Sequence, residues 1–206
     1  MAVSSYTTIK AAIADWLARS DLTAAIDDFI DLTEARIYSD PELRLRFMET
    51  ALSVTISSGV AALPSDFLAL KHANISGSPT QWLDIKPAQW IYMHYPLRAS
   101  EAKPIYVAVD GGNLIFGPYP DSGYTVNGIY YAKATALSAS NETNYWTNNA
   151  PGLILFGALV ESGPYIGDDS RLPMWEAKYQ QIRTQLIEQE AREKFPKGST
   201  LATTTA

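Results

Sequence analysis

The sequence predicts an α+β protein in which N- and C-terminal helices form a helical bundle with an inserted, small antiparallel β-sheet unit. Three observations lead to this prediction. Apolar residues recur with the period of an amphipathic helix in residues 6–50. From about residue 51 to residue 132 they alternate with polar residues, which is the period of a strand. The helical period then returns near Pro151, a residue well suited to a first helical position.

Two amphipathic helices are expected at the N-terminus. Their apolar faces are Ile9, Ala12, Ile13, Trp16 and Leu17 in the first, and Leu22, Ile26, Phe29, Ile30, Thr33 and Ile37 in the second. Residues 20–21, Ser-Asp, have the turn and capping chemistry expected between them. Asp40-Pro41 marks the end of the second helix, because a residue before proline disfavours the α conformation. A shorter helical piece is expected over residues 43–48.

The alternating region predicts a series of short strands. They are expected at residues 52–56, 68–75, 82–85, 105–109, 114–116 and 124–132. Glycine- and proline-containing turn signals separate them, at 58–59, 76–79, 110–113 and 120–123. The segment AQWIYMHY, between two prolines, reads as one short helix.

Two helices are expected after Pro151. Residues 153–160 are apolar on every face, which predicts a buried helix that ends at Gly163-Pro164. The last helix has apolar positions at steps of three and four, typical of a seam against another helix: Leu172, Trp175, Tyr179, Ile182 and Leu186. The expected domains are therefore a helical domain of residues 1–50 and 150–195, an inserted antiparallel β domain of residues 51–137, and a flexible C-terminal tail of residues 196–206.

Composition excludes several classes of function. The 206 residues contain no cysteine, which removes disulfides, thiolate metal sites and cysteine nucleophiles. The net charge of −6, with scattered Lys and Arg, argues against tight nucleic-acid binding, although an acidic wall would suit a polymer that only passes. The N-terminus does not have the pattern of a secretory signal, and no apolar run is long enough for a membrane span. A soluble protein with no membrane partner is expected.

No catalytic, cofactor-binding or metal-binding site is predicted. The acidic residues Asp27, Asp28, Asp31 and Glu34 occupy the polar side of the second helix and read as a solvated face. The two histidines, His72 and His94, have no partners at the spacing that a metal site or a catalytic triad needs. Gly111-Gly112 reads as a hairpin turn, Asp168-Asp169 as a helix N-terminus, and the sequon at residues 141–143 carries no weight without a signal peptide.

Aromatic residues are concentrated in NLIFGPYPDSGYTVNGIYYAK, residues 113–133. Tyr124, Val126 and Tyr130 fall on one strand face, and Thr125, Ile129 and Tyr131 on the other. Packing inside a sheet explains most of them, because aromatic cross-strand pairs stabilise sheets. A base-stacking platform would need more basic neighbours than Lys133 alone.

The order of the segments resembles a known family. A helical opening leads through VAALPSDFLALKHANISG to NLIFGPYPDSGYTVNGIYYAKATALS, and then to TNYWTNNAPGLILFGALVESGPYIGDDSRLPMWEAKYQQIRTQL. Together these segments resemble the head-to-tail adaptor (connector) proteins of tailed bacteriophages, especially short-tailed ones. The resemblance runs from about Tyr6 to Glu190 and rests on the order and spacing of short structural motifs such as LPSDF and WTNNAP.

The resemblance implies a structural virion protein without enzymatic activity, made in the host cytoplasm and placed at the head–tail junction. Such proteins form a homo-oligomeric ring, typically a dodecamer, beneath the portal, where they link the capsid to tail or nozzle proteins and line the DNA channel. Phe195, Lys197 and Leu201, in the polar tail, are the candidate portal-contacting residues, and we expect that tail to become ordered on its partner.

Two other classes of function remain open from the residues themselves. The sheet unit could be a carbohydrate- or receptor-binding module mounted on helices, with Trp82, Trp90, Tyr92 and Tyr95 as stacking residues. A soluble enzyme with a site built from unremarkable residues is the third.

Overall fold

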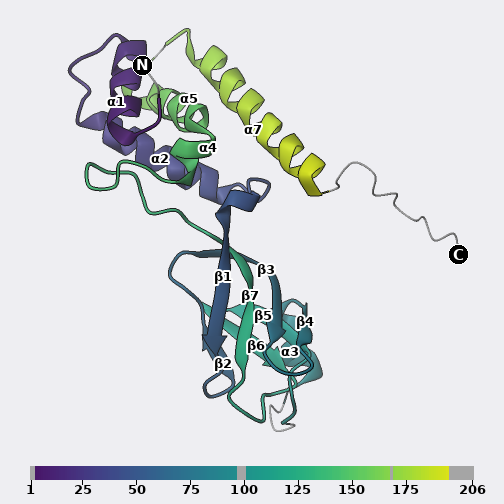
Figure 1. The fold of residues 1–206 in the computed structure, drawn as a ribbon. Helices are drawn as coiled ribbons and strands as arrows, with labels where there is room; N and C mark the ends of the chain where they lie inside the picture. The colour runs from purple at the N-terminus through teal and green to yellow at the C-terminus, as the bar shows by residue number, and fades with distance from the viewer. Residues whose placement is uncertain (1–2, 97–100, 168, 195–206) are drawn as a thin grey trace, which may run out of the picture. The chain divides into compact units, whose positions relative to one another are not determined.

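The computed structural model describes residues 3–96, 101–167 and 169–194. The chain divides into two compact units, a helical one made of the described residues of Met1–Phe47 and Ala134–Ala206, and a β-rich one made of those of Met48–Lys133 (Figure 1). The tail of residues 196–206 and its three candidate contact residues, Phe195, Lys197 and Leu201, lie outside the described residues.

The helical unit is assembled around one buried helix. Its helices are α1 (Tyr6–Leu17), α2 (Ala25–Ser39), α4 (Tyr145–Asn149), α5 (Pro151–Glu161), α6 (Gly163–Ile166) and α7 (Leu172–Lys194). α1, α2, α4 and α7 all pack on α5, whose residues Leu153, Ile154 and Leu159 are buried (Figure 1). The predicted buried helix is confirmed, and its uniform apolar surface follows from neighbours on several sides.

A glycine sets the distance between α2 and α5. A Cβ added to Gly157 would overlap the Cγ2 of Thr33, so only glycine allows the two backbones to come this close. Thr33 itself is buried, and its hydroxyl donates to the carbonyl oxygen of Phe29, 2.8 Å away on the previous turn. The close crossing therefore leaves no polar atom of Thr33 unpaired.

The two N-terminal helices form as the periodicity predicts, but the segment after them does not. The Oγ of Ser5 caps α1 by accepting from the amide of Thr8, 3.3 Å away. α2 ends at Ser39, with Asp40 in extended conformation before Pro41. The helix expected over residues 43–48 is wrong, because only a 3₁₀ turn, Arg46–Met48, forms there, while Leu43 and Leu45 are buried without helical structure. α4 and α6 are too short for the periodicity to predict.

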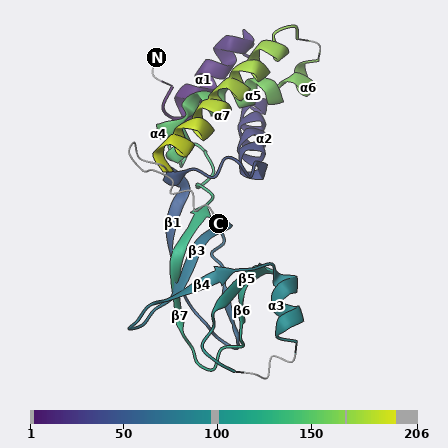
Figure 2. The ribbon, with the colours of Figure 1, turned by 90° about the vertical axis from the view of Figure 1, so that its right-hand side faces the viewer.

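The β unit contains every strand found in the described residues. These strands are β1 (Glu49–Thr55), β2 (Val60–Ala62), β3 (Phe67–Ile75), β4 (Gln81–Ile85), β5 (Tyr106–Asp110), β6 (Asn113–Gly117) and β7 (Thr125–Ala132). They form one sheet in the order β1-β7-β3-β4-β5-β6-β2. A bridge between Ser57 and Val60 joins the two edge strands, so the sheet curls into a nearly closed barrel (Figure 2).

The predicted fold class, a helical bundle with a small inserted antiparallel sheet, is therefore wrong. The protein is mixed α/β, with a seven-stranded barrel-like sheet instead of a small insertion. The sheet is also not purely antiparallel, because Asp84 and Ile85 of β4 pair in parallel with Tyr106 and Val107 of β5. Alternation identifies single strands but carries no information about their partners, which is why the size of the sheet was missed.

The inside of the barrel explains the aromatic residues of segment 113–133. Phe116, Val126 and Tyr130 are buried in the main core, and Tyr124 packs against it. The ring of Tyr130 stacks on Phe67, with centroids 5.6 Å apart, and its hydroxyl donates to Asp66. The prediction that these side chains form the inner face of a sheet is confirmed.

A second, smaller core lies on the outside of β5 and β6. α3 (Ala88–His94) places Ile91 against Ala108 and Ile115 there, with Trp90, Tyr95 and Tyr106 around them. Trp90 stacks on His94 at 3.9 Å and meets Tyr106 edge-on at 4.7 Å. Two of the four aromatic residues proposed for sugar stacking, Trp90 and Tyr95, are therefore engaged in attaching α3 to the sheet.

Candidate functional site

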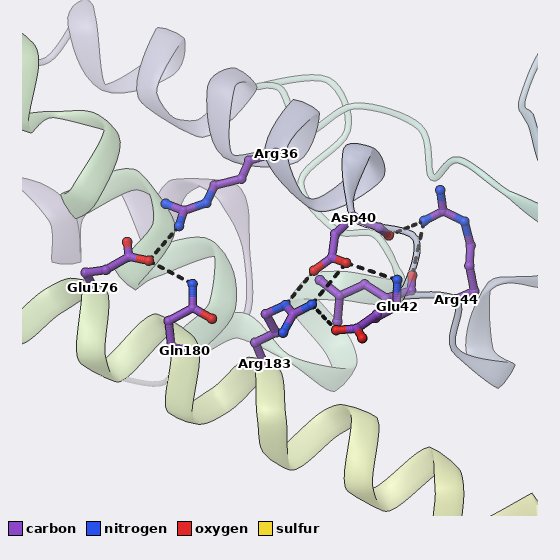
Figure 3. Close-up of polar contacts among 8 residues, drawn as sticks. Arg36, Asp40, Glu42, Arg44, Glu176, Gln180 and Arg183 are labelled. Atoms are coloured by element: carbon purple, nitrogen blue, oxygen red, sulfur yellow. Dashed lines mark hydrogen bonds and ion pairs between the residues drawn. The ribbon is translucent and has the colours of Figure 1, made fainter.

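α7 is a candidate functional element because the face that it turns to the other helices of the unit combines an apolar seam with a row of charged side chains. Trp175 and Tyr179 are buried, and Ile182 and Leu186 are half-buried, so the predicted seam packs against α5 as expected. Beside this seam, a row of polar residues on α7 contacts α2 and the loop that follows it (Figure 3).

The first contact of this row is centred on Arg36 of α2. Its guanidinium donates to the Glu176 carboxylate at 2.7 Å and to Glu161 at 3.3 Å, and Gln180 also donates to Glu176 at 2.8 Å (Figure 3). The same guanidinium lies over the ring of Tyr179, 4.2 Å from its centroid. Arg36 therefore joins α2, α5 and α7 through charge and through a cation–π contact.

The second contact is a forked ion pair between Arg183 and Asp40. The Nε and Nη2 of Arg183 donate to the two carboxylate oxygens of Asp40 at 2.5 and 3.1 Å, and Nη2 also contacts Glu42 (Figure 3). Both side chains of the forked pair are mostly buried. The hydrogen bonds from Arg183 hold the pKa of the Asp40 carboxyl below its ordinary value.

Arg44 completes the attachment of the loop to the end of α2. Its guanidinium donates to the carbonyl oxygens of Asp40 and Tyr38, at 2.8 and 2.9 Å. These are carbonyl groups at the C-terminus of a helix, where a cation is also favoured by the helix dipole. The loop of residues 40–45 is thus held to α2 by Arg44 and to α7 by Arg183.

The far half of α7 contacts the same segment once more. The Glu190 carboxylate accepts from the backbone amide of Arg46 at 3.0 Å, and Glu193 pairs with the Arg46 guanidinium. A cavity of about 280 Å³ lies between these residues and Leu45, Phe47, Asn149 and Leu186.

Sequence reasoning did not single out Arg36 or Arg183, and it used Asp40 only to mark the end of the second helix. A signal was present, however. Glu176, Gln180 and Arg183 follow one another at spacings of four and three, so they form one stripe beside the apolar seam, and Arg36 and Asp40 are also four residues apart. In the stripe of α7 the acidic residue comes first (Glu176, then Arg183), whereas in the other stripe the basic residue comes first (Arg36, then Asp40). Stripes that match in this way, each beside an apolar face, indicate helices that pack side by side.

Two of the four acidic residues of α2, Asp27 and Glu34, make structural contacts, and Glu34 is not solvated. Glu34 is only 4% exposed, and its carboxylate accepts from the amide of Leu137 at 3.4 Å and from Nδ2 of Asn144 at 3.0 Å. Burial raises the pKa of this carboxyl. Asp27 accepts from the hydroxyl of Tyr6 at 2.6 Å and pairs with Lys10. The interpretation of all four as a solvated face is wrong for Glu34, which lies between Ile30 and Ile37 on the buried side.

The remaining candidate residues are not brought together into a site. The ring of His72 contacts Trp82 edge-on at 5.3 Å, whereas His94 stacks on Trp90. Gly111-Gly112 connects β5 and β6 as the predicted hairpin turn. The Asp169 carboxylate accepts from the amide and guanidinium of Arg171 just before α7, and Asp168 lies outside the described residues. Within the described ranges, no three His, Asp or Glu side chains are grouped to hold a metal ion.

Among the residues that the structure describes, none of the helices combines the length and the apolar character needed to span a bilayer.

Comparison with known proteins identifies the family. No curated protein matches the sequence. The family model described as SU10 adaptor protein matches residues 4–203, which is nearly the whole chain. The resemblance to head-to-tail adaptors, inferred from the order of the segments, is confirmed by this match. The chain therefore belongs to the SU10 adaptor protein family, the phage head-to-tail adaptors of the short-tailed type.

Proposed function

We propose that copies of this chain form a closed ring, a dodecamer, beneath the portal of the phage head, where the ring links the capsid to tail or nozzle proteins and lines the channel through which DNA passes. The observation that carries this proposal is the family match over residues 4–203, since it includes both the helical unit and the β unit.

The helical unit has the properties that a subunit of such a ring needs. α7 is fixed along its length, by Arg36 near its start, by Arg183 in its middle and by Arg46 near its end. A long helix held at three points can carry a contact to a neighbouring molecule without losing its position. This rigidity supports a structural role over a role that depends on moving loops.

The charge of the chain supports a channel that does not retain DNA. The net charge is −6, and each of the guanidinium groups of Arg36, Arg171 and Arg183 is already paired with a carboxylate. A surface that does not neutralise phosphates releases few counterions and so binds DNA weakly. DNA would pass such a wall in transit, without specific recognition.

Assembly with the portal tests the proposal. We expect the free chain to be monomeric or weakly associated, and a mixture with the portal protein of the same phage to sediment as one ring-sized complex. Contacts of the head-to-tail kind close into a ring when the rotation per subunit allows it, and the portal can supply that rotation. Electron micrographs of the complex should show a closed ring on the portal. Absence of any complex with that portal would contradict the proposal.

A further inference from the structure

An apolar groove lies between the end of α5 and the start of α7. It has a volume of about 530 Å³, and its lining is apolar apart from one glutamate: Val160, Gly163, Pro164, Gly167, Leu172, Pro173 and Glu176. Pro164 and Pro173 are exposed to solvent, and the neighbouring Tyr165 projects beside them. An apolar surface of this kind on a folded unit typically marks a contact with another molecule.

Two large apolar side chains are exposed away from the groove, one on α7 and one on α1. Met174 is 53% exposed and Trp16, at the end of α1, is 44% exposed. Arg171 connects them, because its Nη1 donates to the carbonyl oxygen of Trp16 at 2.8 Å and it lies one turn before Met174. The indole of Trp16 also contacts the ring of Phe156 edge-on, with centroids 5.3 Å apart, so it is only partly free. We call the exposed parts of Trp16 and Met174 the apolar knob.

Helix geometry places the groove and the knob on opposite sides of α7. Successive residues of an α-helix are rotated by about 100°. Leu172, Pro173 and Glu176 therefore share one flank, and Met174 points to the opposite one. In Figure 2, α6 lies on one side of the start of α7 and α1 lies on the other. One unit thus presents a shallow apolar groove and two exposed apolar side chains that face different ways.

Charged residues around the two surfaces are also complementary. The groove side carries the carboxylates of Glu161 and Glu176, which share the single guanidinium of Arg36. The knob side carries Arg171, paired with Asp169, and the exposed ammonium of Lys178. Along α7 and the residue before it, the groove flank carries Glu176 and the knob flank carries Arg171 and Lys178, so the two flanks differ in the sign of their charge, which favours their approach.

From these observations we infer that the groove takes up the apolar knob, Trp16 and Met174, of a second copy of this chain. The inference rests on the proposed ring and specifies which surfaces meet in it. A ring needs two different surfaces on each subunit that fit one another, and it closes because the same contact repeats around the axis. Here both halves of such a contact occur on one unit, with matching polarity and opposite charge, so the occupant is another copy.

Disulfide crosslinking tests this contact directly, because the chain contains no cysteine of its own. The full-length double variant Met174→Cys/Pro164→Cys carries one thiol on the knob and one in the groove, on opposite sides of α7. Oxidation of the assembled complex with the portal should produce a ladder of covalent oligomers on a non-reducing gel. Each single variant should yield no ladder. The matched control pair is Met93→Cys/Pro164→Cys, since Met93 is 69% exposed but lies on α3, and it should also yield none.

The outcomes separate this inference from the ring itself. A ring-sized complex with the portal under reducing conditions, but no ladder on oxidation, overturns the inference and leaves the ring standing. Failure of the unmodified chain to form any ring-sized complex overturns the proposed function and this contact with it.

A charge on the knob offers a second test that does not depend on thiols. Met174→Asp should fold normally, as judged by circular dichroism, because the side chain is exposed. It should weaken each subunit contact by about tenfold to a hundredfold, the value expected for losing one buried methionine. Met93→Asp should assemble like the unmodified chain. Equal assembly of a folded Met174→Asp variant, or equal loss in both variants, would overturn the inference.

Discussion

At the scale of single residues, the polar groups that matter most are those that charge patterns alone would assign to solvent. Glu34 belongs to a run of acidic residues, yet it is buried and holds the segment of residues 137–144 against α2 through two hydrogen bonds. Arg183 lies on a helix rich in charged residues, yet it makes a forked pair with Asp40.

The buried carboxyl of Glu34 makes stability depend on pH in a defined direction. Burial raises its pKa above the ordinary value of 4.5, so the folded state holds the proton to higher pH than the unfolded chain does. Deprotonation therefore favours unfolding, and stability is lost as pH rises from about 4.5 through the folded pKa. Over this pH range, the free energy of unfolding of the unmodified chain should fall relative to that of Glu34→Gln by about 1.4 kcal/mol for each unit by which folding raises the pKa of Glu34. Urea unfolding over a pH series measures this, and parallel curves for the two proteins would contradict it.

The ion pair between Arg183 and Asp40 makes stability depend on pH in the opposite direction from Glu34, because it stabilises the fold less as pH falls. Arg183→Met should lower the free energy of unfolding at pH 7 by about 1–3 kcal/mol, because it removes the ion-pair partner of the mostly buried Asp40 carboxylate and leaves it only the hydrogen bond from the amide of Glu42. The pKa of Asp40 is lowered in the folded state, so this stabilisation is present above the ordinary value of 3.8 and is lost as pH falls through the folded pKa.

A matched control for Arg183 lies on the same helix. Arg192 pairs with Glu188 one turn away, and both side chains are exposed. Arg192→Met should cost only a small fraction of the effect of Arg183→Met, because exposed ion pairs stabilise little. Chemical denaturation of both variants at pH 7 and pH 3 is the measurement. If the two substitutions lowered the free energy of unfolding equally, the forked pair with Asp40 would stabilise the protein no more than an exposed ion pair does.

At the scale of elements, the crossing of α2 and α5 is the most constrained contact of the helical unit. Gly157→Ala should destabilise the protein by about 1–3 kcal/mol, the usual cost of overpacking, since the new Cβ meets Thr33. Gly152→Ala, in the same helix, is the control, because its Cβ would meet only the terminal methyl of Ile182 at 3.0 Å. Thermal unfolding should separate the two variants, and Thr33→Ser should recover part of the loss in Gly157→Ala. A neutral Gly157→Ala would contradict the close crossing.

The short α3 shows how an element can be attached mainly by apolar and aromatic side chains, without a side-chain cap. Its N-cap residue, Pro87, makes no side-chain hydrogen bond. The helix is held instead by Ile91 in the small outer core and by Trp90 against Tyr106. Gly117 has no room for a side chain because a Cβ would lie 2.8 Å from the ring of Tyr95. Trp90 and Tyr95, two of the four aromatic residues that suggest a binding platform in the sequence, therefore serve to attach one helix.

At the scale of the whole molecule, the proposed ring assigns a role to the C-terminal tail. We expect deletion of residues 196–206 to leave the fold intact and to reduce attachment to the portal. In the full chain, Leu201→Ser should weaken attachment, because burial of one leucine is worth about 1.5–3 kcal/mol and many tethered copies add their contributions. Thr203→Ser is the matched control. Co-sedimentation with the portal measures each variant, and a truncated chain that attaches as well as the full one would remove the tail from the contact.

By itself, the sequence determined the elements whose evidence is local. The period of Ile9, Ile13 and Leu17 located α1, the uniform apolar run of residues 153–160 identified α5 as buried, and the steps from Trp175 to Leu186 predicted the seam of α7. Alternation located six of the seven strands that the described residues form, and the order of all these segments indicated the family. Each of these features depends on neighbours within a few turns or strand residues, so a single chain displays it.

Only the tertiary structure decided which of these elements meet. The parallel pairing of β4 with β5, and the pairing of β7 with both β1 and β3, join segments whose patterns carry no mark of their partners. The burial of Glu34 and the fork between Asp40 and Arg183 likewise depend on residues more than 100 positions away. Pairing over such distances is selected by the packing of the whole core and not by local preference, because the same strand or helix pattern fits many partners equally well.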